Sequence, residues 1–124
     1  MSRFTPMYRA ALAVGLLLCA TSSLWADYAA IAYSASTGKY GYSYGYSSRA
    51  RAENAALNNC SGDDAVIVVW VENGYAALAL GDERGAYGTG WSTRSRADAE
   101  ATALANARER TSGAYIARWV FSGR

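Results

Sequence analysis

The chain contains one sequence twice: Tyr28–Cys60 reads YAAIAYSASTGKYGYSYGYSSRARAENAALNNC, and Tyr75–Ala107 reads YAALALGDERGAYGTGWSTRSRADAEATALANA. A shift of 47 positions aligns them with 15 identities in 33 residues. Identity at a fixed offset over this length indicates an internal duplication. The two copies occupy residues 27–73 and 74–124, and two copies are too few for an open solenoid. We therefore expect them to share one core.

Each copy has the pattern of strand, strand, helix, strand. Residues 28–34 are short and apolar, and residues 40–46 alternate Tyr with Gly or Ser, which is the period of a strand. Ser48 suits a helix N-cap before residues 50–59, which are rich in helix formers. Residues 65–72 are nearly all apolar and mostly β-branched, which predicts a central strand buried on both faces.

These elements predict an α+β fold. Two tandem β-β-α-β repeats would share one mainly antiparallel sheet, with both helices packed on one face. Asn73-Gly74 is typical of a tight hairpin turn and would join the two copies within that sheet. Residues 27–124 would thus form one domain, because this length is enough for a single modest core.

Residues 1–26 have the features of a secretory signal peptide. Arg3 and Arg9 precede an uncharged apolar run over residues 10–20, which is too short to span a bilayer. Cleavage is expected after Ala26, leaving a secreted or periplasmic domain with no membrane span. An alternative is lipidation at Cys19, but a small residue normally precedes a lipidated Cys, and Leu18 stands there.

The composition of residues 27–124 excludes several classes of function. These residues include 10 basic and 10 acidic side chains, so the net charge is zero. No basic cluster suggests nucleic-acid binding. The chain has no His, which removes the usual general base and the commonest metal ligand. We expect no metal and no cofactor.

The chain resembles a bacterial secreted family known as domain of unknown function 4189. The resemblance is carried by Tyr28–Ser34, Gly41–Tyr46, the Ser48–Cys60 helix pattern and the strand ending Val68-Val69-Trp70, and it continues through the second copy. It implies a signal peptide, a secreted or periplasmic location and no established catalysis. The family pattern also implies cysteine pairing, but Ala107 stands where Cys60 would repeat.

Glu53 and Glu100 occupy equivalent positions in the two predicted helices. Helical spacing places Glu53 inside an apolar arc formed by Ala50, Leu57 and Cys60, where a lone carboxylate is costly. One interpretation is a pair of catalytic carboxylates in a small cell-wall glycan hydrolase. The other is structural, with each Glu bonded to backbone amides, to a Tyr hydroxyl or to the Arg one turn earlier. Duplication favours the structural role.

Aromatic residues form a stripe on the second strand of each copy. In the first copy they share one side of the strand, opposite Gly and Ser. They would form core if that side lies under the helices, and a binding or homodimer face if it points outward. The candidate binding residues are Tyr40, Tyr42, Tyr44, Tyr46, Tyr87 and Trp91.

Three other residues are expected to be structural. Trp70 and Trp119 align when the offset grows to 49. Cys60, at a helix end, suits a small buried hydrophobe, with an intermolecular disulfide or a reactive thiol as the alternatives. Together these observations favour an exported, non-catalytic interaction module that binds a protein or glycan in the envelope or outside the cell.

Overall fold

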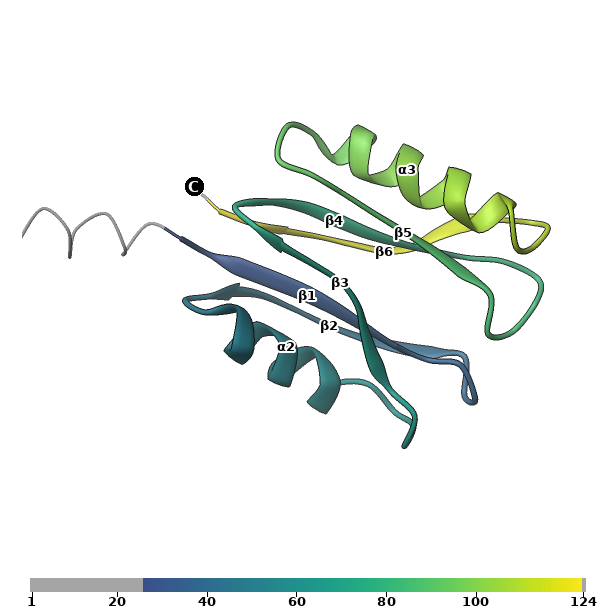
Figure 1. The fold of residues 1–124 in the computed structure, drawn as a ribbon, viewed down its shortest axis with the longest axis horizontal. Coiled ribbons are helices and arrows are strands. Elements are labelled where there is room, and N and C mark those ends of the chain that lie inside the picture. Colours follow the sequence, from purple (N-terminus) through teal and green to yellow (C-terminus); the bar gives the residue numbers. More distant parts are fainter. Residues whose placement is uncertain (1–25, 124) are drawn as a thin grey trace, which may run out of the picture.

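The structure is a computed structural model that describes residues 26–123 (Figure 1). The predicted signal peptide therefore lies outside the described residues, apart from Ala26. Within the described part of the chain, no helix combines the length and apolar character needed to cross a membrane.

The predicted order of strand, strand, helix, strand is confirmed in both copies. The first copy consists of β1 (Tyr28–Ser34), β2 (Lys39–Tyr46), α2 (Arg49–Asn58) and β3 (Val66–Glu72); the second consists of β4 (Gly74–Leu80), β5 (Tyr87–Ser92), α3 (Arg96–Arg108) and β6 (Tyr115–Ser122). Ser48 and Ser95 are the N-caps, and each hydroxyl accepts a hydrogen bond from a backbone amide in the first turn of its helix. The cap predicted at Ser48 is thus confirmed, and Ser95 takes the same role in the second copy.

The strands form two sheets, so the expected single sheet is wrong. The first sheet has the order β2-β1-β3 and the second β5-β4-β6, and all pairs are antiparallel. The expected hairpin at Asn73 does not form. Asn73 instead adopts a left-handed backbone conformation, with φ of 50°, and donates its N–H to the Asp27 carbonyl at 2.9 Å. The chain thereby passes from the first sheet to the second.

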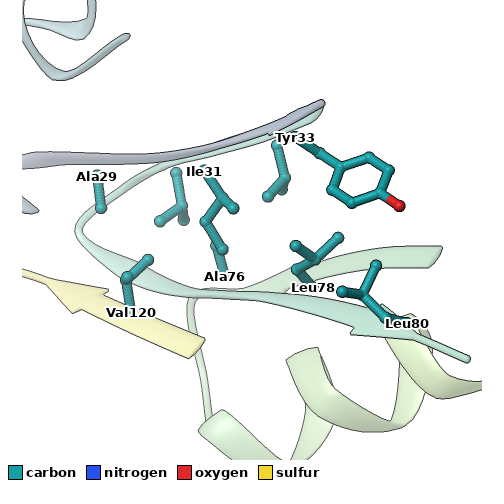
Figure 2. Packing of buried hydrophobic residues seen from close by; sticks show 9 residues of the cluster. Ala29, Ile31, Tyr33, Ala76, Leu78, Leu80 and Val120 are labelled. Atoms are coloured by element: carbon teal, nitrogen blue, oxygen red, sulfur yellow. The ribbon is translucent and has the colours of Figure 1, made fainter. Parts of the chain in front are cut away.

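The helices lie on opposite outer faces, not on one face as expected (Figure 1). The layers run α2, first sheet, second sheet, α3. Ile31 and Tyr33 of the first sheet meet Leu78 and Leu80 of the second (Figure 2). This apolar layer belongs to both copies, which agrees with the expected shared core.

The strands β1 and β4, rather than β3, are the central, fully buried ones. The apolar run of β3 predicted burial on both faces, yet β3 is an edge strand and Val66 and Trp70 are exposed. In β1, Ala30 and Ala32 face α2, whereas Ile31 and Tyr33 face the other sheet together with Ala29. Small side chains on one face and large ones on the other therefore identify the central strand better than β-branching does.

Glycine and alanine bring each helix close to its sheet. Gly41 lies against the backbone of Ala56 and Cys60, and a Cβ there would come within 2.5 Å of backbone atoms. In the second copy Gly88 and Gly90 meet the α3 backbone in the same way. The glycine side of β2 and β5 therefore faces the helices, and their aromatic side faces the space between the sheets.

Candidate functional site

Glu53 and Glu100 each form an ion pair with an arginine one turn earlier. Nε of Arg49 lies 2.9 Å from Oε2 of Glu53, and its guanidinium lies 4.1 Å from the ring centroid of Trp70. The second copy repeats this arrangement with Arg96, Glu100 and Trp119, at the same two distances.

The structure therefore places both glutamates in local structural pairs. Pairs of this kind, four residues apart and in contact with solvent, contribute about 0.3–0.5 kcal/mol each. The apolar arc expected around Glu53 is correct for Leu57 and Cys60, which pack in the apolar cluster under α2, and wrong for Ala50, which is exposed. The buried residues within α2 are Ala52 and Ala56.

The two carboxylates do not form a common site. They belong to helices on opposite outer layers, with two sheets between them, and neighbouring layers of this kind are roughly 10 Å apart. Catalytic carboxylates in glycosidases stand at most about 10 Å apart, flanking one bond. The arrangement thus offers no support for the glycan hydrolase considered from the sequence.

The predicted aromatic stripe is divided by the fold. Tyr40 and Tyr42 are partly buried between the sheets, whereas Tyr44 is 61% exposed. The alternation ends at Gly45, whose φ is +76°, and Tyr46 is exposed beyond it. One stripe therefore supplies both core and surface. Its core part lies under the second sheet and not, as the core alternative expected, under the helices.

The equivalent residues of β5 are divided in the same way. Tyr87 packs on Tyr33 with ring centroids 5.3 Å apart, while Trp91 is 61% exposed. Tyr87 thus belongs to the end of the core, and Trp91 belongs to the surface.

Trp91 lines a groove between the edge strands β3 and β5, which we call the β3–β5 groove. Its volume is about 570 Å³. Trp70, Glu72 and the two threonines Thr89 and Thr93 contribute to its walls. The groove therefore combines exposed aromatic surface with hydroxyl groups and one carboxylate.

A second, smaller groove occupies the equivalent place between β2 and β6, and we call it the β2–β6 groove. Its volume is about 290 Å³. The lining residues are Tyr42, Tyr44, Arg118, Trp119, Val120 and Phe121. The Arg118 guanidinium lies 4.2 Å from the ring centroid of Tyr42, so this groove carries a positive charge against an aromatic wall.

The two grooves contain residues that were not predicted as site residues. Arg118 and Phe121 were missed because the sequence comparison emphasised identities between the copies. These two residues replace Val69 and Glu72 at the offset of 49 positions, so differences between the copies were the available signal. Trp70 and Trp119 are expected to be structural, and their rings pack against the guanidinium groups of Arg49 and Arg96. Both residues also border the grooves.

Cys60 has the surroundings of a buried structural thiol. It packs with Ala52 and Ala56 under α2 and forms no disulfide within residues 26–123. Burial, and then the negative charge of Asp64, raise the pKa of the Cys60 thiol. A raised pKa reduces the thiolate fraction, so the site does not favour nucleophilic chemistry.

Comparisons with known proteins identify a family but no characterised relative. Residues 28–120 match the family described as "Domain of unknown function (DUF4189)". No curated protein and no solved structure matches the chain. Within residues 26–123, no cluster of three or more potential metal ligands is found.

Proposed function

The chain belongs to the family "Domain of unknown function (DUF4189)", and we propose that it is an exported, non-catalytic interaction module that binds a protein or glycan through aromatic side chains at its sandwich edges. The β3–β5 groove is the principal site in this proposal. Export is proposed from the basic start, the short apolar run and the small residue Ala26.

The exposure of Trp91 is the observation that carries the proposal. A Trp side chain that is 61% exposed leaves a large apolar surface in water, although Trp is usually well buried. Aromatic residues are enriched in the centres of binding interfaces, where partner contact removes that surface from water. A bound partner that covers Trp91 would recover this apolar surface.

The polar groups of the β3–β5 groove support specific recognition. Thr89 and Thr93 offer hydroxyls that donate and accept hydrogen bonds, and Glu72 offers a carboxylate acceptor. The flat face of an indole can stack on a sugar ring or on an apolar side chain. This combination of an apolar platform and a few polar groups is typical of binding sites.

We would test the proposal by affinity capture and by sedimentation with peptidoglycan. The bait is residues 27–124, which include every described helix and strand. The variant is Trp91→Ala, and the matched control is Tyr115→Ala, because Tyr115 is also exposed but lies outside the β3–β5 groove. Envelope and secreted fractions of the source cells supply the candidate partners.

The proposal expects a protein or glycan that wild type and Tyr115→Ala retain and Trp91→Ala loses. Native circular dichroism must first be shown for both variants. Equal retention by all three proteins would place binding elsewhere and overturn the role of the β3–β5 groove. Absence of any retained protein or glycan would overturn the interaction module itself.

A further inference from the structure

Arg118 differs from the two arginines that the repeat places on the helices. Arg49 and Arg96 are each neutralised by a glutamate at 2.9 Å. Among the described residues, no carboxylate forms an ion pair with Arg118. Its equivalent in the first copy is Val69, so the fold of the repeat does not require a charge at this position.

The Arg118 guanidinium has hydrogen-bonding capacity that the described protein does not use. Its Nε is buried and has no hydrogen-bond partner in residues 26–123. The rings of Tyr42 and Tyr40, at 4.2 and 5.7 Å from the guanidinium carbon, attract its charge but accept no strong N–H hydrogen bond. A buried donor without an acceptor is costly. The two Nη groups of the same guanidinium are not buried and form no hydrogen bond in residues 26–123, so they are the donors that a ligand in the groove can reach.

Two hydrogen bonds between the sheets hold this groove in shape. The Tyr40 hydroxyl donates to the Ala117 carbonyl at 3.2 Å, and the Gly45 amide donates to the Ser122 hydroxyl at 3.0 Å. Arg118 lies between these two bonds along β6. In the described chain no side-chain hydrogen bond joins β3 to β5 at the opposite edge, where the groove is larger. The β2–β6 groove is therefore the better preorganised of the two.

The walls of the β2–β6 groove are aromatic and accessible. Tyr44, which is 61% exposed, follows Tyr42 on the side of β2 that faces Arg118, whereas Trp119 and Phe121 border the groove from β6 with their rings on the α3 side, against Arg96 and Tyr75. A volume of about 290 Å³ lies at the lower end of small-molecule sites. The groove is thus suited to a single ring rather than to a long chain.

We infer that the β2–β6 groove binds a sugar ring that carries a carboxylate. The carboxylate would accept hydrogen bonds from the Arg118 guanidinium, a geometry in which arginine can use two parallel N–H groups. The ring would lie against Tyr42 and the exposed Tyr44. A peptide terminus is less well matched, because carboxyl-terminal recognition uses nests of backbone amides. This inference adds a second site, with a stated ligand class, to the proposed function.

The test uses two sugars that differ only in charge. Methyl glucuronide carries the carboxylate, and methyl glucoside has a hydroxymethyl group in its place. Binding is measured by calorimetry and by amide and side-chain chemical shifts of residues 27–124. We expect the glucuronide to bind at least about tenfold more tightly, with shifts at Arg118 Nε–H and at the ring protons of Tyr42 and Tyr44 in the wild-type protein. Equal affinity for the two sugars, or shifts confined to other surfaces, would overturn the inference.

Variants locate the charge that the sugar recognises. Arg118→Gln should abolish the preference for the glucuronide, whereas Arg49→Gln, the matched control at the other repeat, should retain it. If Arg118→Gln does not fold, Arg118→Lys keeps the charge but loses the paired N–H geometry and should weaken binding. Tighter binding of N-acetylphenylalanine than of the glucuronide would overturn the sugar assignment. Tyr115→Ala, which lies outside both grooves, should leave glucuronide binding unchanged, and glucuronide should leave the Trp91 indole shift unchanged, which separates this site from the β3–β5 groove.

Discussion

Asp64 ties together two loops of the first repeat. Its carboxylate accepts hydrogen bonds from the Ser34 hydroxyl at 2.6 Å, from the Ser36 hydroxyl at 2.8 Å and from the Ser36 amide at 3.0 Å. These bonds to the charged form, from Ser34 first and then from Ser36, hold the pKa of Asp64 below its ordinary value of 3.8. In the second repeat the two loops exchange these roles. Asp82 lies on the loop between β4 and β5, and its carboxylate accepts a hydrogen bond from the hydroxyl of Ser112, on the loop after α3.

The lowered pKa of Asp64 predicts a loss of stability in acid. A carboxyl whose pKa is lower in the folded state stabilises the fold above its unfolded pKa, and this contribution disappears as the pH falls through the folded pKa. Asp64→Asn should therefore unfold at lower urea concentration than wild type at pH 6, and the difference should shrink below about pH 4.

The control for this titration is Asp63→Asn. Asp63 is exposed and its side chain makes no hydrogen bond in the described residues, so its replacement should cost less stability at pH 6 than Asp64→Asn. A difference between Asp64→Asn and wild type that stays constant from pH 6 to pH 3 would contradict the role of the Asp64 carboxylate.

The two faces of strand β5 have different roles, one in packing against α3 and the other in lining the β3–β5 groove. Gly88 and Gly90 face α3, where the backbone of the helix leaves no room for a Cβ. Thr89 and Trp91 face the opposite side and line the β3–β5 groove. One face of the strand therefore sets the distance to the helix, and the other offers groups to solvent.

A single methyl group on the helix face of β5 should destabilise the protein. In Gly90→Ala the new Cβ would collide with the Ala99 carbonyl and the Ala103 amide, which are backbone atoms and cannot rotate away. Overpacking of this kind costs about 1–3 kcal/mol. Urea unfolding measures the loss, with Thr89→Ser on the opposite face as the control. An unfolding free energy within about 0.5 kcal/mol of wild type would contradict the close approach of α3.

The layer between the two sheets makes the whole molecule one cooperative unit. Ile31 of β1 and Leu78 of β4 are fully buried there, and each belongs to a different copy of the repeat (Figure 2). Neither copy alone covers the inner face of its own sheet. The duplicated sequence therefore encodes two halves whose main apolar contact is with each other.

Truncation of Leu78 should destabilise both halves together. Leu78→Ala leaves a cavity between the sheets and should cost about 2–5 kcal/mol. Leu104→Ala is the matched control, because Leu104 lies on α3 and is only partly buried, so its loss should be smaller. Circular dichroism and Trp fluorescence should give coincident unfolding curves for Leu78→Ala. Two separate transitions would show that the halves fold independently.

The candidate site was predicted in part. Tyr44 and Trp91 were named from their strand positions, and both are exposed at the sandwich edges. Tyr40 and Tyr87 were named from the same alternation, yet they pack against the core. Alternation assigns residues to one side of a strand but does not tell how far a neighbouring sheet covers that side.

The repeat, the order of elements and the helix cap could be derived from the amino-acid sequence, because each depends on residues a few positions apart or on the comparison of two copies. The Arg–Glu pairs were one of several alternatives that the sequence left open, and the structure selects them. The number of sheets, the opposite placement of the helices and the meeting of Arg118 with Tyr42 could not be derived from the sequence. These features depend on contacts between segments distant in the chain. A strand pattern with small residues on one side and aromatic residues on the other is satisfied by one sheet or by two, and the packing of the complete chain selects between them.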